Sequence, residues 1–487
     1  MSARDKLVIY LILASAFVVM LNETIIGVAL PKIMEELDVE PADAQWLLTA
    51  FMLTMAVVIP LSGFFMRRFT SRQVYITAIA LFCVGTLLAA MSTGFGMLVI
   101  ARVVQAVGTG VMIPLLMTTI MTLVPPHQRG KMMGNITIVM SVAPALGPLA
   151  AGLVLNSLDW RWVFWLVLPI GLAALALGIW KMENVSETER IGVDVVSIVL
   201  SAVAFGGLVY GLSEIANAVR GPVPLEPWIP IVIGAISLGL FVWRQIVLQR
   251  RSAPLMDLRT FAQPGFPVAI GLMAIVVAVM FGSIILLPLY VQDGLGYAPL
   301  VAGLVVLPGG LLQGVAGPFV GRIYDRVGPR PLLIPATILA TLSLTAMAMF
   351  LTETTPIWAI IAMHIGLSVS LAFTFPPLMN SAMGALPPKL YASGSAVVGT
   401  SQQLFGAAGT AALIVVFTLA STSSAAASEA SAVVAGIHLA FLVAAFASIG
   451  AIILAAFIRR PSSEIGGGHG HDPANDIEFP EGVPAVP

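Results

Sequence analysis

Charged residues are scarce in this sequence of 487 residues. Asp, Glu, Lys and Arg make up 10% of the chain, whereas hydrophobic residues make up 59%. Soluble domains carry roughly 25% charged residues. So few charges cannot cover a water-soluble surface, and the composition therefore excludes an ordinary soluble domain. The net charge of −1 gives no support to nucleic-acid binding.

Cysteine is almost absent, and so are the motifs of metal and cofactor chemistry. The single cysteine, Cys83, lies in an apolar run, which excludes an intramolecular disulfide and a cysteine metal cluster. The sequence has no Walker motif and no combination of nucleophile and base. His469 and His471 lie in a Gly-rich stretch, where exposed spacer residues are more common than metal ligands. We expect no metal, no cofactor and no enzymatic activity.

Apolar runs of about twenty residues, long enough to cross a bilayer, recur along almost the whole chain. The first run is too long for a cleavable signal peptide and carries Glu23 near its outer part, so we expect it to be retained. The sequence predicts an all-α membrane protein with fourteen spans near residues 7–31, 44–66, 73–92, 96–118, 133–155, 163–181, 195–215, 228–248, 266–290, 299–320, 332–351, 357–379, 394–420 and 436–458.

The positions of Lys and Arg predict the orientation of these spans. We place the N-terminus in the cytoplasm and assign each of the 23 Lys and Arg residues to a side of the membrane. Arg102 lies inside a span, Lys32, Arg161 and Arg220 lie outside the cell, and all the others lie in the cytoplasm. This asymmetry follows the positive-inside rule, and one miscounted span would destroy it. We therefore expect both termini in the cytoplasm. Residues 461–487 lack periodicity and are predicted to form a disordered cytoplasmic tail.

Two segments 258 residues apart indicate an internal duplication. The loop from Gly63 to Arg72 aligns with the loop from Gly321 to Arg330, and the start of span five resembles the start of span thirteen. Repeated helical halves are typical of secondary transporters. We predict an N-terminal half at 1–181, an inserted helix pair with linkers at 182–260, a C-terminal half at 261–460 and the tail at 461–487.

The second of these loops resembles the signature of the major facilitator superfamily, Gly-x-x-x-Asp-Arg-x-Gly. It is complete at Gly321, Asp325, Arg326 and Gly328, whereas the first loop has Arg67 in the place of the aspartate. Other segments are similar to the fourteen-helix drug:proton antiporter branch, the EmrB-like and QacA-like multidrug exporters: Asn22-Glu23-Thr24, Arg102-Val-Val-Gln105, Gly147-Pro148 with Gly152, and Trp160-Arg161-Trp162. The first of these and Arg-Phe-Thr-Ser-Arg at 68–72 look most like lincomycin-resistance exporters.

The resemblance implies a major facilitator fold and a proton-coupled antiporter that exports amphipathic or cationic drugs by alternating access. It implies a multi-pass protein of the bacterial plasma membrane, active as a monomer, whose partners are protons, small amphipathic molecules and membrane lipids. A dedicated exporter of one endogenous metabolite, lipid or antibiotic is the alternative. From another class, a membrane receptor or enzyme would need a signalling domain or a catalytic motif, which the sequence does not offer.

Two ionisable residues lie deep within spans, where charge is costly and usually functional. Counting from the helix ends places Glu23 and Arg102 at the same depth, roughly 9–12 Å below the outer surface. Our hypothesis is that Glu23 binds and releases the coupling proton and that Arg102 modulates it. The alternative is a fixed ion pair. The branch usually has an aspartate where this chain has Asn22, and His364 is a further candidate for proton relay or for simple packing.

The remaining candidates are polar, small or loop residues, each of which can also serve packing alone. The candidates for contact with substrate are Asn22, Glu23, Gln105, Gln313, Asn380 and Gln402, with Gln403 beside the last. The antiporter motif comprises Gly147, Pro148 and Gly152. The gating loops comprise Gly321, Asp325, Arg326 and Gly328, in which a carboxylate and guanidinium groups can form a charge latch, with Arg67 and Arg68 in the first half. We expect His438, at the outer edge of the last span, to pack only.

Overall fold

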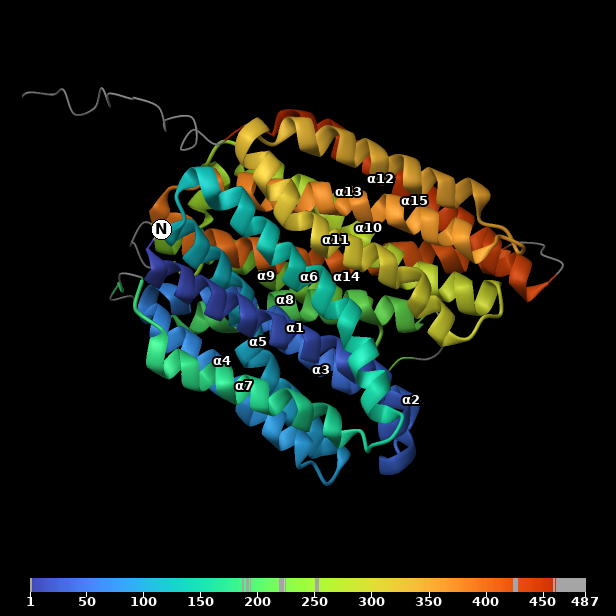
Figure 1. Cartoon of the computed structure of the whole chain (residues 1–487), viewed down its shortest axis with the longest axis horizontal. Coiled ribbons are helices and arrows are strands. Elements are labelled where there is room, and N and C mark those ends of the chain that lie inside the picture. The colour runs from blue at the N-terminus through green and yellow to red at the C-terminus, as the bar shows by residue number, and fades with distance from the viewer. Residues whose placement is uncertain are drawn as a thin grey trace, which may run out of the picture.

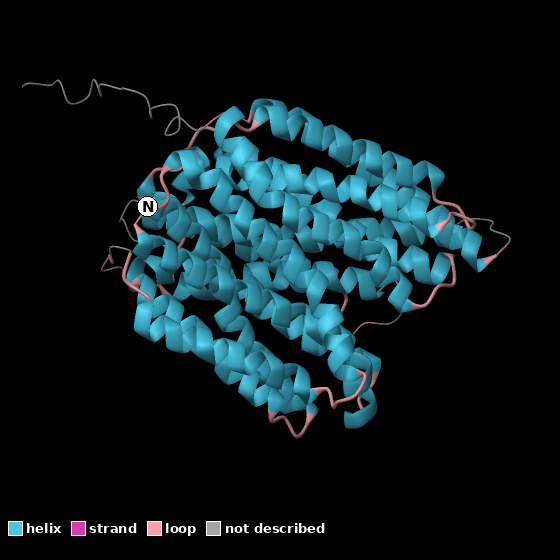
Figure 2. Cartoon of the chain, in the orientation of Figure 1, coloured by secondary structure: helices cyan, strands magenta, loops and turns pink. Residues whose placement is uncertain are grey.

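The computed structural model describes residues 2–185, 188–189, 192, 194–218, 223, 225–249, 254–423, 428–458 and 460, and this part is helical almost throughout (Figures 1 and 2). The predicted tail, with His469 and His471, lies outside the described residues. The described chain contains fourteen long helices that run along one common direction (Figure 1). The predicted all-α membrane fold is confirmed.

The helices follow the predicted spans closely and extend past several of them. The predicted N-terminal half comprises α1 (Ala3–Leu37), the short α2 (Pro41–Ala44), α3 (Trp46–Arg68), α4 (Ser71–Ala90), α5 (Phe95–Leu123), α6 (Arg129–Leu155) and α7 (Arg161–Lys181). The predicted inserted pair comprises α8 (Val195–Ala218) and α9 (Trp228–Gln249). The predicted C-terminal half comprises α10 (Phe266–Leu289), α11 (Pro299–Val327), α12 (Arg330–Phe350), α13 (Ile357–Gly384), α14 (Tyr391–Ser423) and α15 (Glu429–Phe457).

Thirteen of the described long helices are both long and apolar enough to cross a membrane, and α6 is the one outside that set. The last helix begins at Glu429, several residues before the predicted start of its span. His438 therefore lies within α15, about two turns after its start. The short α2, which the sequence did not predict, fills part of the connection between the first two long helices.

Contacts between the two halves run along two seams. Helix α6 packs against α11 on one side of the molecule, and α3 packs against α14 on the other. The inserted helices α8 and α9 pair with each other, and α8 also lies against both α3 and α14. The inserted pair thus covers the second seam, where the two halves meet.

One end of the bundle, which we call the basic end, carries the N-terminus (Figure 1). Because α1 leads away from this end and α3 returns to it, the basic end also holds the last turn of α3 with Arg67 and, after α4 and α5, the start of α6 with Arg129. Glycines allow the halves to touch there: a Cβ added at Gly321 would overlap the backbone of Gly130, and one at Gly63 would lie 3.0 Å from the carbonyl oxygen of Ala392. Because backbone meets backbone across both seams, the two halves are closed against each other at the basic end.

Candidate functional site

Arg102 is buried at the contact between α5, α1 and α3, with 1% of its surface exposed. Its Nη1 donates to Gln105 Oε1 at 3.1 Å and to Asn22 Oδ1 at 3.4 Å, and its Nε donates to the carbonyl oxygen of Leu47 at 3.4 Å. Its guanidinium lies 4.0 Å from the centre of the Phe51 ring. The described hydrogen-bond acceptors of this buried cation and the ring beside it are therefore all neutral groups.

Gln105 has a positioning role in this cluster. Its Oε1 accepts from Arg102, and its Nε2 donates to Thr86 Oγ1 at 2.9 Å on α4. It is completely buried. Because both ends of its amide are engaged inside the N-terminal half, Gln105 orients Arg102 and is not available to a substrate in this state.

Glu23 follows Asn22 on α1 and is only partly buried. The helices α1 and α5 pack against each other here, and Arg102 of α5 donates a hydrogen bond to Asn22, the residue before Glu23. No ion pair joins the two side chains among the described residues, so the fixed ion pair considered as an alternative is not formed. Asn22, which stands where the branch usually has an aspartate, takes the hydrogen bond of Arg102 instead.

The glycine motif of α6 lies beside this site. A Cβ added at Gly147 would overlap Thr24 Oγ1 and lie 3.1 Å from the carbonyl oxygen of Leu21, so the glycine allows α6 to touch α1 next to Glu23. No atom lies within 4 Å of a Cβ built at Gly152, and the expected close helix approach therefore fails there. Pro148 lies within α6, and its side chain is outside the described part of the structure.

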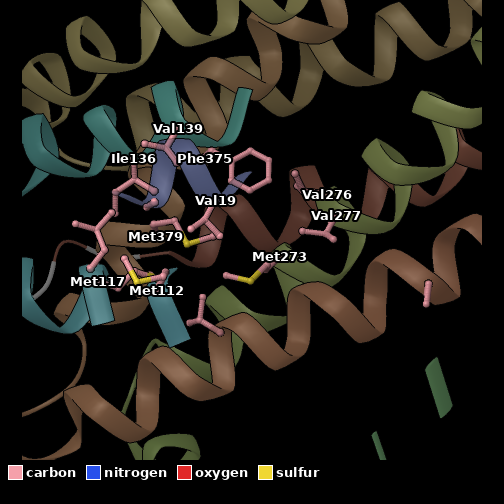
Figure 3. Close-up of a cluster of buried hydrophobic side chains, with 14 of the residues drawn as sticks. Val19, Met112, Met117, Ile136, Val139, Met273, Val276, Val277, Phe375 and Met379 are labelled. Carbon is pink, nitrogen blue, oxygen red and sulfur yellow. The ribbon is translucent and has the colours of Figure 1, made fainter. Parts of the chain in front are cut away.

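Apolar side chains of the two predicted halves gather in one cluster, and those labelled in Figure 3 come from five helices. Methionines supply much of it, and each is almost fully buried. The labelled members are Val19 of α1, Met112 and Met117 of α5, Ile136 and Val139 of α6, Met273, Val276 and Val277 of α10, and Phe375 and Met379 of α13. Methionine side chains are flexible and adapt to varied partners. This cluster closes the centre of the molecule between the halves.

The other polar candidates are dispersed over the C-terminal half. His364 is buried in α13, with its Nε2 3.4 Å from Ser368 Oγ and with Gly309 of α11 against its ring. Asn380 is buried in α13, whereas Gln313 on α11 is partly exposed. Gln402 and Gln403 are partly exposed on α14, and the ring of His438 contacts the carbonyl oxygen of Leu351. No described hydrogen bond links these residues to Glu23 or Arg102.

Asp325 connects the halves at the basic end. Its carboxylate oxygens accept hydrogen bonds from the backbone N–H groups of Gly130 at 2.8 Å and Lys131 at 3.0 Å, in the first turn of α6. The latch predicted between a carboxylate and guanidinium groups is therefore a contact between a carboxylate and a helix N-terminus. Arg326 is exposed, and Gly328 ends α11 with a φ of 82° that favours glycine.

In the first half, Arg67 and Arg68 differ sharply. Arg68 is exposed. The guanidinium of Arg67 donates to the carbonyl oxygen of Pro254, in the linker after α9, and lies 3.8 Å from Glu189. The linker residues that Arg67 reaches were missed by the sequence reasoning. Residues 244–257 mix polar and apolar side chains, so hydropathy carries no signal for these contacts.

Comparison with known proteins places this arrangement in a family. The profile of the Major Facilitator Superfamily matches residues 12–410. The chain belongs to the major facilitator superfamily. Lincomycin resistance protein LmrB of Listeria monocytogenes serovar 1/2a is 37% identical over 455 residues, covering 92% of this chain and 95% of that protein. LmrB of Bacillus subtilis is also 37% identical, over 457 residues.

A more distant sequence relative and a solved structure of the same fold are also similar to this chain. A multidrug resistance protein B homolog of Mycobacterium tuberculosis is 28% identical over 399 residues, covering 81% of this chain and 73% of that protein. The human organic anion transporter MFSD10 (TETRAN) has a TM-score of 0.67 at 14% identity and covers 93% of this chain and all of its own. This major facilitator protein is thus a multi-pass membrane transporter related to drug-resistance exporters, and it is not an enzyme.

Proposed function

We propose that this chain is a proton-coupled antiporter that exports amphipathic or cationic compounds, drugs among them, by alternating access. The proposal rests chiefly on the position of Glu23. Glu23 lies inside a membrane-spanning helix as a partly buried residue, next to Asn22, which Arg102 contacts, while the described hydrogen bonds of Arg102 go to neutral groups. A carboxyl that is not tied into a pair is free to exchange a proton for a cationic group.

The methionine-rich cluster supplies a surface for the apolar part of such a compound. Val19 belongs to this cluster and lies four residues before Glu23, which places the two side chains on neighbouring turns of one face of α1. The axial separation is about 6 Å. One amphipathic molecule can therefore contact the cluster with its apolar body and Glu23 with its charge once the halves have parted.

The closed basic end supports alternating access. If this end faces the cytoplasm, as the distribution of Lys and Arg predicts, the structure represents a state closed to the cytoplasm, with both termini on that side. We place the protein in the bacterial plasma membrane, in keeping with its bacterial relatives. Two of these are named as lincomycin resistance proteins, which favours drugs as substrates.

Transport in proteoliposomes with an imposed pH gradient tests the proposal. The substrates are a cationic dye and a lincosamide, and the variants are wild type, Glu23→Gln and Glu35→Gln. Glu35 is an exposed glutamate on the same helix and serves as the matched control. We expect gradient-driven transport by wild type and Glu35→Gln and none by Glu23→Gln.

The other outcomes are equally informative. Equal transport by Glu23→Gln would remove Glu23 from the proton site and direct attention to His364. A wild-type protein that moves neither compound would contradict broad drug export and favour a dedicated exporter of one natural molecule.

A further inference from the structure

Residues 254–257, which we call the strap, connect the inserted pair to the C-terminal half at the basic end. Leu255, Met256 and Asp257 are each less than 5% exposed. Gln245 of α9 holds the strap, since its Oε1 accepts from the backbone N–H groups of Leu255 at 2.7 Å and Met256 at 3.2 Å. Such burial and hydrogen bonding are unusual for a linker, because most linkers run exposed over the surface.

Gln245 is itself fixed within the inserted pair. Its Nε2 donates to Ser197 Oγ at 2.8 Å, and Ser197 donates to Asp194 at 2.5 Å. Asp194 also accepts two hydrogen bonds from the guanidinium of Arg244, at 2.7 and 2.8 Å. A continuous polar network therefore runs from the start of α8 through the end of α9 to the strap.

The strap also contacts both halves of the transporter. The guanidinium of Arg67, in the last turn of α3, donates to the carbonyl oxygen of Pro254. The backbone N–H of Asp257 donates to Ser393 Oγ at 3.3 Å, in the first turn of α14. The strap thus bridges the α3–α14 seam, and α3 cannot part from α14 unless one of these two contacts breaks.

The internal repeat explains why a bridge is needed here. On the other seam, the Asp325 carboxylate of α11 binds the N-terminus of α6 directly. The equivalent position in the first half holds Arg67, which has no acceptor atom and would be repelled by the positive N-terminus of α14. The strap provides an acceptor for Arg67 and a separate hydrogen bond to α14.

We propose that the strap is the first-half counterpart of the Asp325 contact and stabilises the state closed at the basic end. Arg67, Gln245 and Ser393 are its positioning residues. The inserted pair then acts on the transport cycle through Gln245. This proposal rests on the alternating access described above, but it depends neither on the transported compound nor on the proton site.

Distance measurement by electron paramagnetic resonance tests the strap. Spin labels are placed on Phe69 and Lys389, which are exposed at the basic ends of α3 and α14, in a Cys83→Ser background. We expect one short distance for the wild type. Because Arg67→Leu removes a hydrogen bond from a charged donor, we expect it to raise the population of a second, longer distance about tenfold.

Two matched variants separate this role from a general loss of packing. Arg68→Leu removes the same type of side chain from the neighbouring exposed position, and Arg67→Lys keeps a donor for Pro254. Both should show the wild-type distance. An unchanged short distance in Arg67→Leu, or an equal change in Arg68→Leu, would overturn the proposal.

Milder variants cover the case in which Arg67→Leu does not fold. Gln245→Leu removes the acceptor for the two strap N–H groups, and Ser393→Ala removes the contact with α14. Each should also populate the longer distance, and wild-type distances in both would refute the role of the strap. The measurement needs neither substrate nor gradient, so its failure is distinct from a failure of the proposed transport function.

Discussion

Replacing Asp325 with asparagine should open the first turn of α6. The first four N–H groups of a helix have no partner within it, and those of Gly130 and Lys131 are bonded to the two carboxylate oxygens of Asp325. Asparagine keeps one acceptor oxygen, loses the other and removes the negative charge that the positive end of α6 attracts. The variant therefore changes the acceptor and leaves the size of the side chain almost the same.

The size of the effect follows from these contacts. A hydrogen bond to a charged group contributes about 1.5–3 kcal/mol. The interaction of a carboxylate with a helix N-terminus adds about 0.3–1 kcal/mol. Because asparagine retains one weaker hydrogen bond, we expect a net loss of about 2–3 kcal/mol, which corresponds to about 30- to 150-fold more frequent local opening.

Hydrogen–deuterium exchange of the peptide at the start of α6 measures this opening. Exchange at residues 130–131 should become faster in Asp325→Asn by the stated factor, while a peptide from the middle of α4 should stay unchanged. Arg326→Gln removes a charge from the adjacent exposed position and should exchange like the wild type. Unchanged protection in Asp325→Asn, or faster exchange in Arg326→Gln as well, would refute the reasoning.

Two further predictions concern the stability of the purified protein, measured by thermal unfolding in detergent. Gly147→Ala should lower the unfolding temperature, because the added methyl group overpacks against Thr24 at a cost of about 1–3 kcal/mol. Gly152→Ala should leave the unfolding temperature unchanged, since a methyl group at that position meets open space. Equal effects of the two variants would contradict this prediction. The hydrogen bonds from Arg244 hold the pKa of Asp194 below its usual value. The contribution of ionised Asp194 to the free energy of unfolding is therefore complete above about pH 4 and declines as the pH falls through the lowered pKa. In Asp194→Asn this acid-sensitive part of the stability should be missing.

Much of the fold could be predicted from the sequence because the bilayer restricts the solutions. Runs of about twenty apolar residues must form helices in lipid, which restricts the fold to a helical bundle. The positions of Lys and Arg add a prediction of its orientation. The helix ends were less predictable, because α11, α13 and α14 continue past the apolar region into the basic end. There the helices are stabilised by contacts between the halves, such as that of Asp325 with α6, which leave little trace in hydropathy.

The contacts within the candidate site could not be predicted from the sequence. Counting residues from the helix ends predicts the same membrane depth for Glu23 and Arg102. It does not predict which side chain faces the guanidinium, because neighbouring residues on a helix point about 100° apart. The rotation of α1 directs Asn22 and not Glu23 at the guanidinium, and only packing determines that rotation. The strap could not be foreseen for a similar reason: it depends on the contacts of Arg67 with Pro254 and of Asp257 with Ser393, which join residues far apart in the sequence.

Proton release on substrate binding tests the central claim most directly. Purified transporter in a weakly buffered detergent solution is mixed with a transported cation, and the pH change is recorded while binding is followed independently by tryptophan fluorescence. If Glu23 exchanges a proton for substrate, the wild type and Glu35→Gln release protons on binding, and Glu23→Gln binds without release. Proton release from Glu23→Gln at the wild-type level, or binding to the wild type without any release, would contradict the account.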